Sequence, residues 1–176
     1  LEHSSILELG AGSGLMAVDI LLHLEQLNCL PEHYFILDLS PDLQVRQRET
    51  LTQYAPHLLS KVQWLASLPT EPFRGVILGN EVLDAMPVEL FTVTEQGLTS
   101  VHVGVVNDEF TALAMPSNAA EYLRTLLPAD LALPYTSEFN PAIAPWMHSL
   151  ADHLQAGAVL LIDYGYERAD YYHSER

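Results

Sequence analysis

The feature that most constrains the fold of this chain is a short apolar run that leads directly into a glycine-rich turn. Residues 5–9 predict a buried strand, residues 10–14 form a G-x-G-x-G turn, and a helix is expected from Leu15 onward with Ser13 as its N-cap. Glycines let the backbone approach a ligand closely, and a helix N-terminus offers unpaired N–H groups. This order is typical of an open parallel sheet that holds a nucleotide-like cofactor.

The glycine spacing and one carboxylate narrow the choice of cofactor. A dinucleotide turn of the form G-x-G-x-x-G would need its third glycine at position 15, where the chain has Leu15. Glu8 lies two residues ahead of the first glycine, and its charge suits a cationic ligand but would repel a pyrophosphate. S-adenosylmethionine carries an ammonium and a sulfonium group, so the pattern favours it. A plain strand-to-helix connection remains the alternative.

The net charge of the chain indicates which classes of partner it is suited to bind. The 176 residues are enough for one domain, and 49% of them are apolar, which argues against disorder. Seven Lys and Arg residues against 23 Asp and Glu residues give a formal charge of −16. Because neutralising a phosphate backbone needs a basic surface, we expect no nucleic-acid partner. An acidic chain suits a basic protein partner, or simply has a well-solvated surface.

Cysteine, histidine and hydropathy patterns exclude several other classes. Cys29 is the only cysteine, which rules out an intrachain disulfide and a cysteine-based metal cluster. His148 and His153 are five residues apart and do not share a helical face, so we expect no metal site. No apolar run is long enough for a membrane span and no signal peptide is visible. The chain starts at Leu1 without Met, so we expect a fragment that lacks terminal portions.

A second acidic residue follows the second predicted strand. Residues 34–38 read as this strand, and it ends at Asp38, 24 residues after Gly14. A carboxylate at this place typically accepts hydrogen bonds from a ribose diol. Asp38 could instead cap the next helix, predicted over 42–54, but Ser40 and Pro41 already fit the N-cap and N1 positions. We therefore favour the ribose interpretation.

The fourth predicted strand leads into a further pair of carboxylates. Strands are expected over 62–65 and 73–79, and the latter runs into Asn80 and Glu81. Ligands bind at the carboxyl ends of strands in an open α/β sheet, so both side chains should face the cleft. Glu81 and Asp84 are three residues apart, and a helical turn would place them on one side, where they could grip a guanidinium. The alternative is that they are acids favoured at a helix N-terminus.

The later part of the chain changes from the alternating β–α pattern. An antiparallel meander is predicted, followed by a short helix, a loop with several prolines and an amphipathic helix that Gly157 closes. The predicted strands are 91–94, 101–106 and 110–115, the helices are 119–127 and 141–154, and a last strand spans 158–162. We expect the meander, an insertion in this pattern, to cover the cleft, and the last strand to deliver Asp163 to the cleft edge.

Four stretches together resemble the MidA-type family of S-adenosylmethionine-dependent methyltransferases. They are residues 8–14, residues 38–41, the Asn-Glu-Val-Leu-Asp-Ala-Met-Pro stretch at 80–87, and Asp-Tyr-Gly-Tyr at 163–166. The resemblance implies a Rossmann-like class I methyltransferase sheet with helices on both faces and an antiparallel β-meander inserted after the fourth strand. It also implies one methyltransferase domain over 1–176, with 88–135 as a substrate-side insertion.

The resemblance further implies an activity. The family includes the mitochondrial arginine methyltransferase needed for respiratory complex I assembly, so we expect methyl transfer from S-adenosyl-L-methionine to a protein arginine, with a respiratory complex subunit as one candidate partner. The expected compartment is the cytoplasm for a bacterial member and the mitochondrial matrix for eukaryotic relatives. The expected cofactor-binding residues are Glu8, Gly10, Ala11, Gly12, Asp38 and Leu39, and the expected catalytic residues are Glu81, Asp84 and Asn80.

Other functions remain open from the sequence. The acceptor could be a small molecule, or the chain could be a cofactor-binding assembly factor whose role is to dock a partner. Methylation of an exocyclic base is disfavoured, because the residues after the fourth strand lack a Pro-Pro-aromatic platform on which a base would stack. A nicotinamide dehydrogenase is disfavoured by the glycine spacing. The sequence gives no indication of the oligomeric state.

Overall fold

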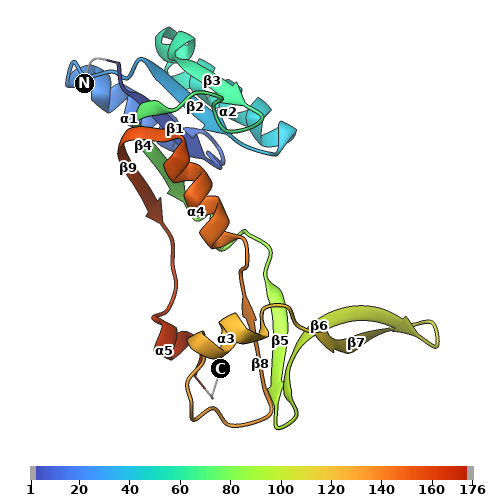
Figure 1. Cartoon of the computed structure of the whole chain (residues 1–176). Coiled ribbons are helices and arrows are strands. Elements are labelled where there is room, and N and C mark those ends of the chain that lie inside the picture. Colours follow the sequence, from blue (N-terminus) through green and yellow to red (C-terminus); the bar gives the residue numbers. More distant parts are fainter. Residues whose placement is uncertain (1–2, 174–176) are drawn as a thin grey trace. The chain divides into compact units, whose positions relative to one another are not determined.

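The computed structural model describes residues 3–173, which form two compact units (Figure 1). The first unit contains residues 3–85 and 144–163, and the second contains residues 86–143 and 164–173. The predicted insertion at 88–135 lies wholly within the second unit. Whether the chain acts as one domain stays a prediction, and each unit is described by itself.

The first unit is built on a five-stranded parallel sheet. The order of its strands is β3-β2-β1-β4-β9, and every neighbouring pair is parallel. The strands are β1 (Ser5–Leu9), β2 (His33–Leu37), β3 (Val62–Leu65), β4 (Phe73–Asn80) and β9 (Leu154–Ile162). This confirms the predicted α/β class with a parallel sheet.

Helices pack on both faces of this sheet, as the prediction required. On one face, α1 (Leu15–Gln26) and α2 (Pro41–Tyr54) bury Leu21 and Leu51 against Tyr34 and Ile36 of β2. On the other face, α4 (Ile143–Asp152) buries Leu150 against β1 and β4. A short 3-10 helix, η1 (Pro56–Lys61), connects α2 to β3. Leu7 of β1 and Tyr34 and Ile36 of β2 are fully buried between these layers, whereas β9 has no buried residue.

Three neighbouring strands of the sheet approach each other closely at two glycines. Ser5, Gly75 and Gly157 are register partners on β1, β4 and β9. Gly75 has a φ of 149° and Gly157 one of 148°. A Cβ on Gly75 would overlap the carbonyl oxygen of Ser5, and one on Gly157 would overlap the carbonyl oxygen of Gly75. The packing of β1, β4 and β9 therefore depends on the absence of side chains at both positions.

The prediction that Gly157 closes the preceding helix is wrong. The helix ends at Asp152, and β9 begins at Leu154, so Gly157 lies inside the strand. Pairing with β4 starts already at Leu154 and continues through Gly157, because the glycine permits the close approach to Gly75. A glycine after a helical pattern often ends a helix, but here the neighbouring strand determines its conformation.

The second unit contains the predicted antiparallel meander. Its sheet has the order β7-β6-β5-β8, with all pairs antiparallel. The elements are β5 (Glu89–Thr94), β6 (Gly97–Val106), β7 (Glu109–Pro116), β8 (Tyr135–Phe139), α3 (Ala120–Leu126) and α5 (Arg168–Tyr171). Asn107 and Asp108 both have left-handed φ values and form the tight turn that joins β6 to β7, as predicted.

The strand β8 was not expected from the sequence. It has apolar residues only at its ends, Tyr135 and Phe139, which pack with Phe91 and Leu123 in the core of the second unit. Its middle residues are polar, and it pairs within the sheet with β5 alone. The strand therefore depends on a distant partner, which no local pattern reveals.

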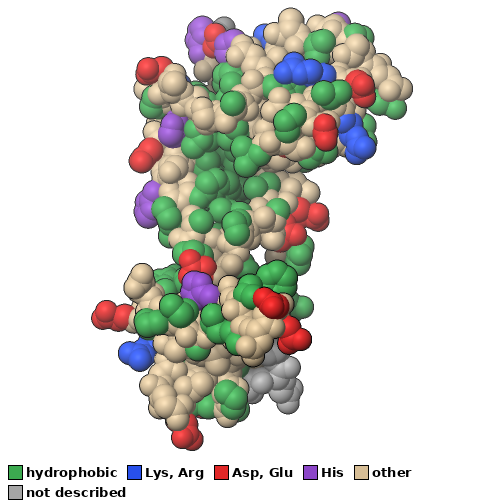
Figure 2. All heavy atoms as spheres, turned by 90° about the vertical axis from the view of Figure 1, so that its right-hand side faces the viewer, with side chains coloured by type: hydrophobic (Ala, Val, Ile, Leu, Met, Phe, Trp, Pro, Cys, Tyr) green, Lys and Arg blue, Asp and Glu red, His purple; other side chains and the backbone are tan. Residues whose placement is uncertain are grey.

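Two surface properties of the described residues bear on partners. None of the helices within residues 3–173 is long and apolar enough to cross a membrane. On the face shown in Figure 2, acidic side chains are scattered over the surface and do not form one patch.

Candidate functional site

The carboxyl ends of four neighbouring strands bring most of the predicted site residues to one edge of the parallel sheet. Gly10 follows β1, Asp38 follows β2, Asn80 ends β4 and Asp163 follows β9. Since β2, β1, β4 and β9 are consecutive and parallel, these residues share the same edge. This is where ligands bind in open α/β sheets.

The glycine turn has the backbone that its sequence predicts. Gly10, Gly12 and Gly14 have φ values of 62°, 53° and 81°, and the Gly14 N–H donates to the carbonyl of Ala11 at 2.8 Å. A Cβ on Gly12 would meet no atom within 4 Å, so that side of the turn is open. The turn thus presents main-chain groups without steric cover, as close approach of a ligand requires.

The predicted N-cap at Ser13 is wrong. Gly14 holds the N-cap position of α1, and no side chain caps the helix. A Cβ on Gly14 would lie 3.0 Å from the Cα of Gln47, so a side chain at this position would crowd α2. Gly14 also has a left-handed φ, which residues with a side chain rarely adopt. A glycine meets both requirements. The helix itself begins at Leu15, as predicted, and only its N-cap lies one residue later than expected.

Glu8 is a buried carboxylate with an incomplete set of partners. Its side chain is 0% exposed, and the hydroxyl of Tyr34 donates to Oε2 at 2.7 Å. Oε1 has no hydrogen-bond partner among the described residues. Burial raises the pKa of Glu8, the hydrogen bond from Tyr34 lowers it, and the nearby charge of Asp38 raises it. A carboxylate in this state fits a cationic group that would supply the missing donor.

Acidification is expected to stabilise the wild-type chain relative to a Glu8→Gln variant. Because burial raises the pKa of Glu8 above its ordinary value of 4.5, the folded chain binds a proton there at a pH where the unfolded chain does not. Above the folded pKa, Glu8 is charged in both states and the full burial penalty applies. As the pH falls through the folded pKa toward 4.5, that penalty disappears.

The measurement is the difference in unfolding free energy between the wild type and Glu8→Gln, from urea titrations at a series of pH values. Other titrating groups contribute equally to both proteins and cancel in the difference. Glu49→Gln serves as a control, because Glu49 is an exposed carboxylate on α2. A difference that does not change with pH for Glu8→Gln would show that Glu8 is not a destabilising charge.

Asp38 combines a structural role with spare acceptor capacity. Its Oδ1 accepts from the Ser40 N–H at 2.9 Å, and its Oδ2 accepts from Nε2 of Gln47 at 2.7 Å. Ser40 is the N-cap of α2, with its hydroxyl accepting from the Leu43 N–H, and Pro41 is at N1, as predicted. A carboxylate has about four acceptor positions, so each oxygen of Asp38 can accept a further hydrogen bond. The neighbouring Leu39 side chain is 87% exposed.

The segment after β4 is organised differently from the prediction. Asn80, Glu81 and Asp84 are all exposed, but residues 81–86 form bends and turns, so the expected helical turn is absent. The carboxylate of Asp163 accepts from the N–H groups of Leu83 at 2.8 Å and Asp84 at 3.4 Å. The N–H groups of Leu83 and Asp84 are thus bound by a side chain at the end of the neighbouring strand β9, and not by carbonyl groups of a helix.

Glu81 has an unusual backbone conformation. Its φ is 51°, in the left-handed region that non-glycine residues seldom adopt. Its N–H donates to the carbonyl of Ile162 at 2.8 Å, which ties this residue to the end of β9. Strain of this kind persists where the surroundings impose it and is frequent at functional sites. Grouping of Glu81 with Asp84 on one side stays a prediction.

Sequence reasoning did not single out three residues that the structure places among the contacts of this site. Tyr34 bonds Glu8, Gln47 bonds Asp38, and Trp64 bonds Gln47. Asp163 was expected at this edge, but its hydrogen bonds to the segment after β4 were not. Tyr34, Gln47 and Trp64 lie in strands or a helix, where nothing in their spacing separates them from core residues.

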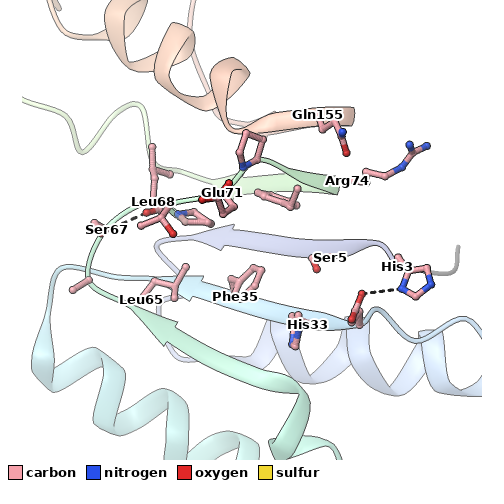
Figure 3. A pocket seen from close by; sticks show the side chains of 16 residues that line it. His3, Ser5, His33, Phe35, Leu65, Ser67, Leu68, Glu71, Arg74 and Gln155 are labelled. Atoms are coloured by element: carbon pink, nitrogen blue, oxygen red, sulfur yellow. Dashed lines mark hydrogen bonds and ion pairs between the residues drawn. The ribbon is translucent and has the colours of Figure 1, made fainter.

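A hollow of about 690 Å³ lies on another part of the first unit (Figure 3). Phe35 and Leu65 line it, together with the loop after β3, and at its border Nδ1 of His3 lies 3.4 Å from Oε2 of Glu32. None of the predicted site residues lines this hollow. It contains no buried polar atom that lacks a partner, so we place the candidate site at the strand ends and not here.

Known proteins are similar to this chain over almost all of its residues. A family model described as "Putative S-adenosyl-L-methionine-dependent methyltransferase" matches residues 2–176. Two solved structures of Burkholderia thailandensis proteins are each 38% identical to the chain, with a TM-score of 0.89 over 99% of it. One of them is bound to S-adenosyl-homocysteine. The chain spans 46% and 45% of the lengths of these two proteins. A comparison with curated proteins found no match.

Proposed function

Because the chain belongs to the S-adenosyl-L-methionine-dependent methyltransferase family whose model matches residues 2–176, we propose that it binds this cofactor and transfers its methyl group. The relative of known structure that binds S-adenosyl-homocysteine supports the proposal, since that molecule is the product form of the same cofactor. The parallel sheet and its glycine turn are the parts of the fold that would hold the cofactor.

The observation that carries the proposal is the unpartnered oxygen of Glu8. A buried carboxylate with one free acceptor is costly unless a donor, preferably a cation, completes it. The ammonium of S-adenosyl-L-methionine is such a donor, directly or through a water molecule, and a dinucleotide carries no ammonium group. The turn from Gly10 through Ala11 to Gly12 would contact the methionine portion through main-chain groups, and Asp38 and Leu39 would flank the ribose.

The chemistry that the cofactor supplies is a methyl group on a positively charged sulfur. The residues of the chain would hold the acceptor in line with that group, and most of the rate enhancement would come from this positioning. The strand ends are suited to it, because the cofactor residues and the Asn80–Asp84 segment follow neighbouring strands of one rigid sheet. No side chain has to form a covalent bond.

The finer proposal is that the acceptor is a protein arginine, as in the MidA-type enzymes. It rests on that resemblance and on the exposed carboxylates of Glu81 and Asp84, with Asn80 beside them. A carboxylate can hold a guanidinium through paired hydrogen bonds and favour charge on the nitrogen that is not methylated. A subunit of a respiratory complex is a partner of this kind. The strained backbone of Glu81 adds support.

A Glu81→Gln variant is expected to keep its cofactor affinity and to methylate an arginine acceptor at least tenfold more slowly. The substitution keeps the shape of the side chain but removes the charge that orients the guanidinium. A loss of about 1.4 kcal/mol of transition-state stabilisation already reduces the rate tenfold. The measurement is transfer of labelled methyl at saturating cofactor, with calorimetric titration of S-adenosyl-homocysteine as the control. Wild-type turnover in this variant would move a small-molecule acceptor ahead of arginine.

The experiment that tests the function itself is a comparison of two ligands on the full-length protein. Calorimetric titration should show binding of S-adenosyl-homocysteine and no comparable binding of NAD. A labelled-methyl assay on a host lysate, followed by mass spectrometry of the modified residue, would then identify the acceptor. Preference for NAD would overturn the proposal.

A second candidate is a cofactor-binding assembly factor that docks a partner without methylating it. One observation favours it: Val103, Val105 and Phe110 on the β6–β7 hairpin are 78%, 64% and 87% exposed. Exposed apolar side chains on one hairpin are typical of a protein contact. The labelled-methyl assay separates the two candidates, because a docking protein would bind the cofactor without turnover.

A further inference from the structure

We propose that Gln47 is a positioning residue that sets the distance between the glycine turn and the Asp38 carboxylate, and thereby fits the site to both ends of one cofactor. This inference rests on the proposed function. It concerns a residue on α2 that none of the sequence patterns singled out.

The contacts of Gln47 are complete and join the two parts of the site. Its side chain is 0% exposed. Nε2 donates to the carbonyl oxygen of Gly12 at 3.1 Å and to Oδ2 of Asp38 at 2.7 Å. Oε1 accepts from the indole N–H of Trp64 at 3.0 Å. One amide group therefore holds the main chain of the glycine turn and the carboxylate at the end of β2.

The orientation of this amide is fixed by chemistry. The indole nitrogen of Trp64 can only donate, so the oxygen of the Gln47 amide must face it. The –NH₂ group must then face Gly12 and Asp38, which are both acceptors. Trp64 is itself held in place, since the guanidinium of Arg48 lies 3.8 Å from the centre of its ring. If the amide flipped, its –NH₂ group would face the N–H of Trp64 and its oxygen would face the two acceptors.

The backbone of α2 is also held against the turn at this point. A Cβ on Gly14 would lie 3.0 Å from the Cα of Gln47, so the third glycine of the turn packs closely against the main chain of α2. Main-chain approach and the side-chain bridge therefore act at the same residue. Together they leave the turn and Asp38 little freedom to move apart.

Few other side chains could replace Gln47. The side chain at this position must donate two hydrogen bonds and accept one. The amide group of glutamine does both, at the end of a flexible side chain. Glutamate would place a second negative charge against Asp38. Methionine would fill the space but remove the hydrogen bonds of Gln47 to the Gly12 carbonyl, to Oδ2 of Asp38 and to the Trp64 N–H.

The structure offers a matched control in the same helix. Gln44 lies three residues before Gln47, and its Nε2 donates to the main-chain carbonyl of Asp38 at 2.8 Å. It therefore makes a hydrogen bond of similar length to the same residue. This hydrogen bond involves neither the glycine turn nor the Asp38 carboxylate.

The test compares Gln47→Met with Gln44→Met in the full-length protein. Both variants should lose thermal stability, because each removes an amide hydrogen bond. The dissociation constant of S-adenosyl-homocysteine should rise about tenfold in Gln47→Met and less than about threefold in Gln44→Met. Trp64→Phe, which keeps an aromatic ring but removes the indole donor that orients the amide, should weaken binding in the same direction by a smaller factor.

A double-mutant cycle separates positioning from a merely structural role. If Gln47 acts through Asp38, the effect of Gln47→Met on the dissociation constant should shrink when Asp38 is already replaced by alanine. Unchanged affinity in Gln47→Met, with lower stability alone, would overturn the inference and leave the proposed function standing. Equal weakening by Gln44→Met would overturn it too. If the wild type binds no S-adenosyl-homocysteine, the proposed function fails and this inference fails with it.

Discussion

Replacing Gly75 with alanine is expected to lower the unfolding free energy of the first unit by more than about 3 kcal/mol, or to prevent it from folding. The added methyl group would overlap the carbonyl oxygen of Ser5, which is main chain and cannot rotate away. Relief would require β1 and β4 to separate in the centre of the parallel sheet. Gly75 also has a φ of 149°, which side chains disfavour in any case.

Tryptophan fluorescence during urea unfolding measures this effect specifically, because Trp64 and Trp146 both lie in the first unit and are the only two tryptophans of the chain. Gly12→Ala is the matched control, since Gly12 also has a positive φ but has open space where the methyl group would go. Its expected cost is only about 1 kcal/mol. Equal losses in the two variants would mean that backbone strain, and not overlap, explains the effect at Gly75.

A Glu8→Gln variant is expected to bind S-adenosyl-homocysteine roughly ten- to hundredfold more weakly than the wild type. The substitution keeps the size of the side chain but removes the charge opposite the ligand ammonium. A hydrogen bond to a charged group contributes about 1.5–3 kcal/mol, and 1.4 kcal/mol corresponds to a factor of ten in the dissociation constant. Burial strengthens this expectation, because solvent does not screen the Glu8 side chain.

Calorimetric titration gives the two dissociation constants directly. Glu25→Gln removes the same charge from a partly exposed position on α1 and should leave the affinity unchanged. That control excludes an effect of net charge, which matters for a chain with a formal charge of −16. Undiminished affinity in Glu8→Gln would refute the assignment of the ammonium to this carboxylate.

The parallel sheet could be predicted because its information is local. The runs at residues 5–9 and 62–65 are apolar and bounded by turn residues, and both strands were predicted with their observed ends. Ser40 and Pro41 mark the start of α2 for an equally local reason, since their side chains act on the next turn of the helix. The glycine turn and Asp38 follow from the same kind of signal.

The remaining features depend on partners that are distant in the sequence. Asp163 organises a segment 80 residues earlier, and so the predicted helical turn at Glu81 does not form. The strand β8 exists because β5 lies beside it. Gln47 could not be singled out, because the two groups that it binds, on Gly12 and Asp38, come together only after the sheet has formed. The periodicity and spacing of residues in the sequence do not reveal such contacts.

The left-handed backbone of Glu81 has a consequence for anyone who engineers this protein. An L-residue in that region is less stable than glycine by roughly 1–2 kcal/mol, so glycine at position 81 would relieve the strain. A library ranked by melting temperature alone would therefore reward the loss of this carboxylate, as it would reward many changes at active sites. If Glu81 orients the acceptor as we propose, heat resistance and catalysis place opposite demands on this one residue, and a selection has to score both.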